Sequence, residues 1–524
     1  MSSASQVDNK PIESKEELIQ WFEQGNTPAD KRLIGVEHEK APFYLADKGP
    51  VPFKGKKGAA GIEDFIAKMV NEKGWSPAAP ENGVVLSVEK GNRNWTFEPA
   101  GQMELGGAPL KNVHQNAKET DDTITEAVEV TKELGYGMLA MGFHPTHLAK
   151  TLPLMPKSRY KALYDWFEKK KFPSAADVAS STSTVQVNMG YQSEEDMVKM
   201  LRVSLSLQPI AVSMFASSPF AEGKPTGYQS YRSHLLYNNM GGRYGFMLPI
   251  AFDEGFGFEM FADYALNTMP MLGIYKGTVF MDAKGAMFQD FIDGKLDIVP
   301  GQKATLGDWQ NHLNTIWPEV RVRRFLEMRG TDVGPQEMIK ALPAFWVGLL
   351  YDKQALDEAY DMVKDWTNQD RDYLRIMTPQ HGLQTPFMNG TTTVQEIAQN
   401  ALAIAEKGLK RRAVLDANGN DETVYLEPLK EIVSSGRNWA QRLEEKFNKE
   451  WGGDINRVFE EMDYAKNPSV LRASGLVVPA SSVRQEKPEE KKKLILPGDP
   501  EFNLKPSEDA RQPKRKDGSG PKAG

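Results

Sequence analysis

Residues 321–331 read RVRRFLEMRGT and place an acidic and a basic side chain on one face of an expected β-strand. Alternate side chains of a strand share a face, so Glu327 and Arg329 are expected to point the same way. The hard oxygens of a carboxylate suit a divalent cation, and a guanidinium suits a phosphate. We interpret Glu327 and Arg329 as candidate catalytic groups, with Glu327 also a candidate metal ligand. An ordinary salt bridge on a sheet is the alternative interpretation.

A second expected strand, RLIGVEHEKAPFYL at residues 32–45, carries Glu37 and Glu39 on one face. Two carboxylates at this spacing repel each other if both are buried and ionised, so a cation such as Mg²⁺ between them is one interpretation. The other is a sheet edge with both glutamates in water.

A third stretch, WTFEPAGQMELGG at residues 95–107, places Glu98 before a Pro-Ala-Gly turn and Glu104 beyond it. Oxygen-rich sites suit Mg²⁺ or Mn²⁺, and a second strand rich in carboxylates makes a shared site more plausible. The predicted metal ligands are therefore Glu37, Glu39, Glu98, Glu104 and Glu327.

Composition excludes several classes of protein. The 524 residues are 40% hydrophobic and 26% charged with a net charge of −7, as in a soluble globular protein without a nucleic-acid partner. The chain has no cysteine, which excludes disulfides, thiolate metal sites and cysteine nucleophiles.

The longest apolar run, ALPAFWVGLLY at residues 341–351, is about half of what a bilayer requires, so we expect a buried helix. The polar N-terminus resembles no secretory signal, and we expect a cytoplasmic protein.

Helical and strand patterns extend over residues 13–465, in one large domain or two, and the part from about 336 to 465 is expected to be all-helical. Residues 1–12 and the Lys-, Pro- and Glu-rich tail 483–524 are predicted to be disordered. A helix over residues 14–24 is expected to begin with a capping box between Ser14 and Glu17.

The strand TVQVN at residues 184–188 has a polar row in which Gln186 and Asn188 are candidates for binding a small polar substrate. The alternative is that this row faces solvent. Neither a P-loop nor a dinucleotide-binding glycine motif occurs.

Taken together, these stretches resemble the glutamate–cysteine ligase family, in the branch shared by plants and many proteobacteria. The resemblance extends over roughly residues 15–465 and includes LIGVEHEK at 33–40, FEPAGQMELGG at 97–107, MPKSRY at 155–160, TVQVN at 184–188, SPFAEGKPTG at 218–227, YRSH at 231–234, FDEGFGFE at 252–259, WPEVRVRRFLEMRG at 317–330 and ALPAFWVGLLYD at 341–352.

The resemblance implies an α+β fold: a glutamine-synthetase-like catalytic core in which a curved antiparallel sheet forms a funnel surrounded by helices. It also implies that ATP phosphorylates the γ-carboxylate of L-glutamate and that L-cysteine then displaces phosphate to give γ-glutamylcysteine, the first step of glutathione biosynthesis. Mg²⁺ would draw ATP and glutamate together, and Arg159 and Arg232 match family positions that hold glutamate. Oligomeric state is left open between monomer and homodimer.

Two departures from the family pattern keep alternatives open. Ser181 stands where members usually carry an arginine, and YNNMGG at residues 237–242 replaces a stretch that is usually acidic. A γ-glutamyl ligase that acts on another amine is therefore one alternative. A catalytically silent paralogue that regulates a partner is another.

Overall fold

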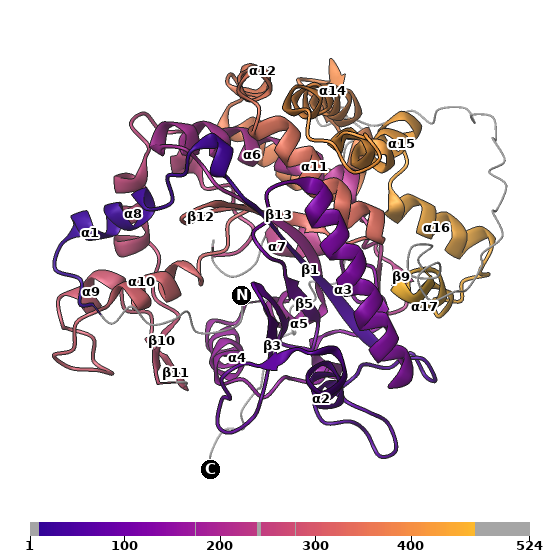
Figure 1. Ribbon diagram of the computed structural model, residues 1–524, viewed down its shortest axis with the longest axis horizontal. Coiled ribbons are helices and arrows are strands. Elements are labelled where there is room, and N and C mark those ends of the chain that lie inside the picture. The colour runs from indigo at the N-terminus through magenta and orange to yellow at the C-terminus, as the bar shows by residue number, and fades with distance from the viewer. Residues whose placement is uncertain (1–9, 173, 238–242, 278, 467–524) are drawn as a thin grey trace, which may run out of the picture.

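The computed structural model describes residues 10–172, 174–237, 243–277 and 279–466, and a nine-stranded sheet runs through its centre (Figure 1). The strand order is β12 (Val320–Val322), β13 (Leu326–Asp332), β7 (Thr184–Met189), β1 (Ile34–Tyr44), β5 (Met103–Gly106), β4 (Arg93–Phe97), β3 (Val88–Lys90) and β2 (Ser76–Pro77), and β6 (Tyr136–Leu139) pairs with β1 outside this order. All of these pairings are antiparallel. The predicted α+β class, built on a large antiparallel sheet with helices around it, is confirmed.

Helices surround the sheet, and three short hairpins lie outside it. The helices are α1 (Lys15–Glu23), α2 (Ile62–Lys73), α3 (Val113–Glu133), α4 (Ser158–Lys170), α5 (Ala175–Ser181), α6 (Glu194–Phe215), α7 (Tyr231–Tyr237), α8 (Phe258–Asn267), α9 (Phe288–Ile292), α10 (Leu306–Leu313), α11 (Gln336–Leu350), α12 (Lys353–Val363), α13 (Asn368–His381), α14 (Val394–Arg412), α15 (Glu427–Ser435), α16 (Trp439–Lys449) and α17 (Arg457–Glu461). The hairpins are β8 (Phe220–Ala221) with β9 (Lys224–Pro225), β10 (Gly273–Lys276) with β11 (Val279–Asp282), and β14 (Pro386–Phe387) with β15 (Thr392–Thr393).

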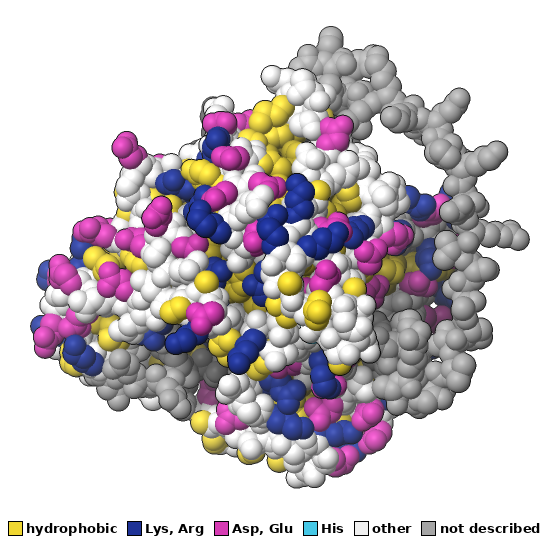
Figure 2. All heavy atoms as spheres, turned by 45° about the horizontal axis from the view of Figure 1, so that its top comes forward, with side chains coloured by type: hydrophobic (Ala, Val, Ile, Leu, Met, Phe, Trp, Pro, Cys, Tyr) yellow, Lys and Arg dark blue, Asp and Glu magenta, His cyan; other side chains and the backbone are white. Residues whose placement is uncertain are grey.

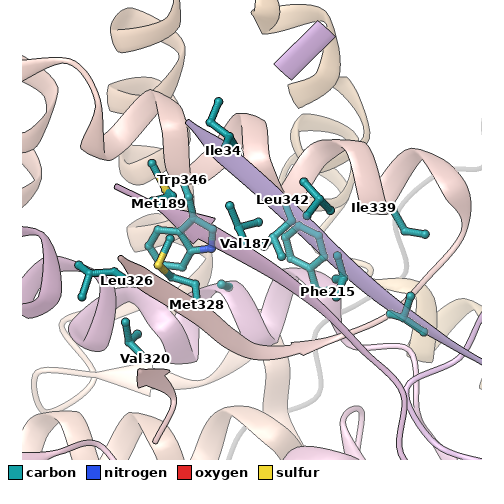
Figure 3. Close-up of a cluster of buried hydrophobic side chains, with 14 of the residues drawn as sticks. Ile34, Val187, Met189, Phe215, Val320, Leu326, Met328, Ile339, Leu342 and Trp346 are labelled. Carbon is teal, nitrogen blue, oxygen red and sulfur yellow. The ribbon is translucent and has the colours of Figure 1, made fainter. Parts of the chain in front are cut away.

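One face of the sheet is apolar because the side chains along each strand alternate between two faces. Helices α6 and α11 pack on that face. Figure 3 shows the contact, which joins Val187, Met189, Leu326 and Met328 of the sheet to Phe215, Ile339, Leu342 and Trp346 of the two helices. Burying each large apolar side chain contributes roughly 1.5–3 kcal/mol, so this layer holds the strands in register.

The apolar run at residues 341–351 lies in α11 and is buried over its whole length, as predicted. Among the residues described, no helix combines the length and the apolar character needed to cross a membrane. On the face shown in Figure 2, acidic and basic side chains are interspersed.

Three predictions of local structure are wrong. Residues 321–331 form two strands instead of one, because the chain turns between β12 and β13 and pairs Arg321 with Glu327. Ser14 is the N-cap of α1, but its side chain accepts no capping hydrogen bond, so the capping box is absent. Ile12, expected in a disordered segment, is buried, and its N–H donates to the carbonyl oxygen of Ala304. The predicted tail at residues 483–524 lies outside the described residues.

Candidate active site

A cavity of about 80 Å³ opens on the polar face of the sheet, large enough for several water-sized ligands. Its charged lining consists of four glutamates and four arginines: Glu37, Glu39, Glu98, Glu104, Arg159, Arg232, Arg321 and Arg329. These side chains come from five strands or strand ends and two helices. The sheet therefore brings together groups that are almost 300 residues apart in the sequence.

Strand pairing explains why the acidic residues meet. Glu39 on β1 lies directly opposite Glu104 on β5, so alternation places both carboxylates on the cavity face. Glu37 has Gln186 as its partner on β7. Glu98 follows β4, in the predicted turn, where Gly101 has a φ of 85° and its N–H donates to the Glu98 carbonyl oxygen at 2.8 Å.

Each of these carboxylates is held by a different donor. The Asn188 Nδ2 group donates to Glu37 Oε1 at 2.7 Å, and the Thr184 N–H donates to Glu39 Oε2 at 2.8 Å. Glu104 Oε2 accepts from Thr96 Oγ1 at 2.8 Å, and Glu98 Oε1 accepts from the Tyr160 hydroxyl at 3.2 Å. The cluster is thus fixed by the strands around it.

Burial and neighbouring carboxylates raise the pKa of Glu39 and Glu98. Burial, with Glu104 and Glu98 nearby, raises the pKa of Glu39 to about 8. Burial, with Glu104, also raises the pKa of Glu98. A divalent cation would remove this repulsion, and the donor set, made only of carboxylates, is of the kind that Mg²⁺ binds. The chemistry of these side chains therefore fits Mg²⁺, whereas their present arrangement does not form a finished site.

The acidic cluster is not a preassembled metal cage. In the described part of the chain, no three Asp, Glu or His side chains already stand in an arrangement that could hold a metal ion. The carboxylates are turned toward their own hydrogen-bond donors, such as Asn188 and Thr184. Binding a cation would require side-chain rotation.

Glu327 is placed differently from the other four predicted ligands. It is fully buried, and in the described structure it is absent from the cavity lining. Arg321 donates to it through Nε at 3.0 Å and Nη2 at 2.8 Å, and Arg329 donates through Nη1 at 2.8 Å. Burial alone would raise the pKa of Glu327, but Arg321, Arg329 and Arg323 together lower it to about 2. The pair Glu327–Arg329 is therefore a salt bridge, the alternative left open by the sequence.

The two arginines of the resemblance both line the cavity. Arg159 stands in the first turn of α4. Arg232, on α7, donates from Nη1 to the Gly330 carbonyl oxygen at 2.8 Å and from Nη2 to the Arg329 carbonyl oxygen at 3.1 Å. The predicted substrate-binding pair separates: Gln186 lines the cavity, whereas Asn188 lies behind Glu37.

Sequence reasoning missed several lining residues, among them Tyr160, Tyr244, Trp317 and Arg321. Tyr244 and Trp317 form an isolated parallel bridge, and their rings lie 4.7 Å apart. No local pattern joins two positions so far apart in the sequence. Arg321 was missed because one strand was expected where the structure has a hairpin, and it is the hairpin register that sets Arg321 opposite Glu327.

Comparison with known proteins assigns the family. The family model described as glutamate–cysteine ligase family 2 matches residues 33–461. The chain belongs to the glutamate–cysteine ligase family. The chloroplastic glutamate–cysteine ligase of Solanum lycopersicum is 40% identical over 451 residues, which cover 86% of this chain and 83% of the relative. Glutamate–cysteine ligase B of Oryza sativa subsp. japonica, also chloroplastic, is 40% identical over 451 residues, covering 86% of this chain and 87% of the relative.

Among solved structures, a glutamate–cysteine ligase from Francisella tularensis in complex with AMP matches with a TM-score of 0.48 and 12% identity, over 84% of this chain and 91% of that chain. At this level the likeness adds nothing to the family assignment.

The family relatives overturn the predicted cytoplasmic location. The tomato and rice relatives are named chloroplastic, as is the one from Arabidopsis thaliana, and these names contradict a cytoplasmic location. The prediction is wrong because it rested on a cysteine-free composition and a polar N-terminus, neither of which distinguishes one reducing compartment from another.

Proposed function

We propose that this chain joins L-glutamate to L-cysteine at the expense of ATP. In the first step an oxygen of the glutamate γ-carboxylate attacks the γ-phosphorus of ATP, and ADP leaves. In the second step the cysteine amine attacks the acyl carbon of the γ-glutamyl phosphate, loses a proton and expels phosphate. The product is γ-glutamylcysteine. One observation supports the proposal above all: four glutamates and four arginines line a single cavity.

The four glutamates of the lining suit the nucleotide. Glu37, Glu39, Glu98 and Glu104 would hold Mg²⁺, which when bound neutralises the charge of the phosphate oxygens. Phosphoryl transfer depends mainly on positioning and charge, so the carboxylates need only fix where the triphosphate lies.

The arginines of the lining suit the anionic substrate and the transferred group. Arg329 would stabilise the phosphoryl group in flight, a role in which one cation contributes several kcal/mol. Glu327 holds Arg329 at 2.8 Å and, by this geometry, acts as its positioning residue. Arg159 and Arg232 would take the carboxylates of glutamate.

Shielding from water is the third requirement, because an acyl phosphate hydrolyses when water reaches it. Tyr160, Tyr244 and Trp317 supply aromatic surface around the charged groups, together with Leu163 and Leu236. Ser181, which departs from the family pattern, is buried, and its neighbours Ala179 and Thr182 line the cavity in its place.

The deciding experiment measures ADP release by the purified protein with ATP, Mg²⁺ and glutamate, adding cysteine, alanine, serine or glycine in separate reactions. We expect release that depends on cysteine, with γ-glutamylcysteine detected by mass spectrometry. Release with another amine alone would replace cysteine as the substrate. No release with any amine would leave the chain as a non-catalytic member of the family.

A further inference from the structure

Asp332 is a buried carboxylate at the end of β13, with 1% of its surface exposed, and it lies outside the cavity lining. Its oxygens accept three hydrogen bonds from two loops. Oδ2 accepts from the Ser217 N–H at 3.0 Å and the Ser218 hydroxyl at 2.6 Å, and Oδ1 accepts from the Ser230 hydroxyl at 2.9 Å. Burying a carboxylate this deeply costs free energy unless its hydrogen-bond partners are held in place.

The same serines hold the start of α7. Ser218 Oγ also accepts from the Arg232 N–H at 3.4 Å, and Ser230 Oγ accepts from the Ser233 N–H at 3.2 Å. Asp332 therefore determines, through two hydroxyls, where the backbone of Arg232 lies.

Asp332 also faces the Arg232 side chain. The Nη1 atom of Arg232 lies 3.8 Å from Asp332 Oδ1 and donates to the Gly330 carbonyl oxygen at 2.8 Å. The guanidinium is thus held by β13 at both its Nη atoms, since Nη2 donates to the Arg329 carbonyl oxygen. Removing the Asp332 charge would leave a buried arginine without its closest anion.

The space around Asp332 is shaped for this side chain. Gly142 packs so closely that an added Cβ atom would collide with the Asp332 carboxyl carbon. The Gly142 N–H donates to Ser217 Oγ at 3.1 Å, which closes the pocket from the other side. The Asp332 side chain therefore has little freedom to rotate. Its position in turn fixes the serine groups that donate to it.

We propose that Asp332 is a positioning residue that holds Arg232 in the orientation that binds a carboxylate of the acidic substrate. The inference rests on the proposed function. Because Asp332 acts through Arg232, its removal should weaken binding of glutamate while leaving ATP and the amine unaffected.

The test is the Asp332→Asn variant, in which shape is kept and charge is lost. We expect the KM for glutamate to rise about ten- to hundredfold, as for loss of a charged hydrogen-bonding partner. The KM for ATP should stay within about twofold and kcat should change far less than the KM for glutamate. A residue that serves only stability would lower the active fraction, and therefore kcat, without this selectivity.

Asp463→Asn is the matched control. Asp463 is also a buried aspartate that accepts backbone N–H groups, from Met138 at 3.3 Å and Ala465 at 3.1 Å. It makes no hydrogen bond to Arg232 or its serines among the contacts described. Its substitution should lower the melting temperature and leave the KM for glutamate unchanged.

A double-mutant cycle with Arg232→Met decides the route. If Asp332 acts through Arg232, the double variant will have the same KM for glutamate as Arg232→Met alone. Additive effects, or a KM for glutamate that Asp332→Asn leaves unchanged, would overturn the proposal.

Two outcomes need separate treatment, because neither would test the role of Asp332: a wild-type protein without activity, and an Asp332→Asn variant that does not fold. If the wild-type protein releases no ADP with glutamate and cysteine, the proposed function fails first. If Asp332→Asn does not fold, Ser230→Ala takes its place, which removes the hydrogen bond to Asp332 and the one accepted from the Ser233 N–H. Ser230→Ala should raise the KM for glutamate about threefold without affecting ATP, and an unchanged KM would overturn the inference.

Discussion

Arg321 and Glu327 face each other across the β12–β13 hairpin, and the Arg321 guanidinium donates to the Glu327 carboxylate from Nε at 3.0 Å and from Nη2 at 2.8 Å. The same carboxylate accepts a hydrogen bond from Arg329 at 2.8 Å. Two arginines of the cavity lining are therefore oriented by one buried anion that does not itself line the cavity. This arrangement determines which substitutions should alter chemistry and which should alter only stability.

The Glu327→Gln variant should lose at least about a hundredfold in kcat, because the amide carries no charge and has one accepting oxygen instead of two, so that it holds Arg329 less firmly. ADP release and the melting temperature are the measurements. Near-normal kcat would show that Arg329 keeps its position without Glu327.

Glu422→Gln is the control for that experiment. Glu422 is likewise fully buried and ion-paired, with Arg412 at 3.3 Å, and it accepts from the Val113 N–H at 2.7 Å. It lies outside the cavity lining. We expect a lower melting temperature with kcat per folded molecule unchanged.

The four glutamates of the cavity lining are the proposed Mg²⁺ ligands. Glu39→Gln and Glu98→Gln should each raise the Mg²⁺ concentration needed for half-maximal ADP release by at least about tenfold, because each removes a proposed ligand. Glu119→Gln is the control, since Glu119 is bound by the Ala108 N–H at 3.1 Å and lies outside the cavity lining. Equal Mg²⁺ dependence in all three variants and the wild type would refute the ligand set.

The sequence allowed the α+β class and the side of each strand on which the glutamates lie to be predicted, because alternation is a local rule. Glu37 and Glu39 on β1, and Glu104 on β5, illustrate this. Which residues contact these glutamates could not be predicted from the sequence. That Asn188 binds Glu37, and that Arg321 turns back onto Glu327, depends on strand order and hairpin register.

Close packing beside the site gives a prediction for Gly330. An added Cβ atom there would collide with Glu319 Oε2 and lie 2.6 Å from Gln208 Nε2, and Gly330 is also an acceptor for Arg232. Gly330→Ala should therefore displace β13, destabilise the fold by roughly 1–3 kcal/mol and reduce activity. Chemical denaturation and ADP release measure the two effects.

Gly334→Ala is the matched substitution four residues further on. Its Cβ atom would meet only the flexible side chain of Met338, at 3.3 Å. We expect stability and activity close to the wild type. If both alanine variants behaved alike, steric crowding at Gly330 would not be the cause.

Two buried histidines make stability depend on pH. Burial lowers the pKa of His144, which lies near His147, to about 3. Burial also lowers the pKa of His312 to about 3, although its Nε2 group bonds the Ala265 carbonyl oxygen at 2.8 Å. Both rings are therefore neutral in the folded protein at neutral pH.

As pH falls below 6.5, the ordinary pKa of histidine, both histidines become protonated in the unfolded chain. In the folded protein they stay neutral down to about pH 3. The free energy of unfolding should therefore fall on acidification through this window, by on the order of 2 kcal/mol for each histidine at about pH 5. Urea denaturation at about pH 5 and about pH 7 measures the difference. The double variant His144→Gln, His312→Gln removes both titrating rings and should show a smaller loss between these two pH values than the wild type. If the loss were as large in the double variant, other groups would have to account for the acid sensitivity.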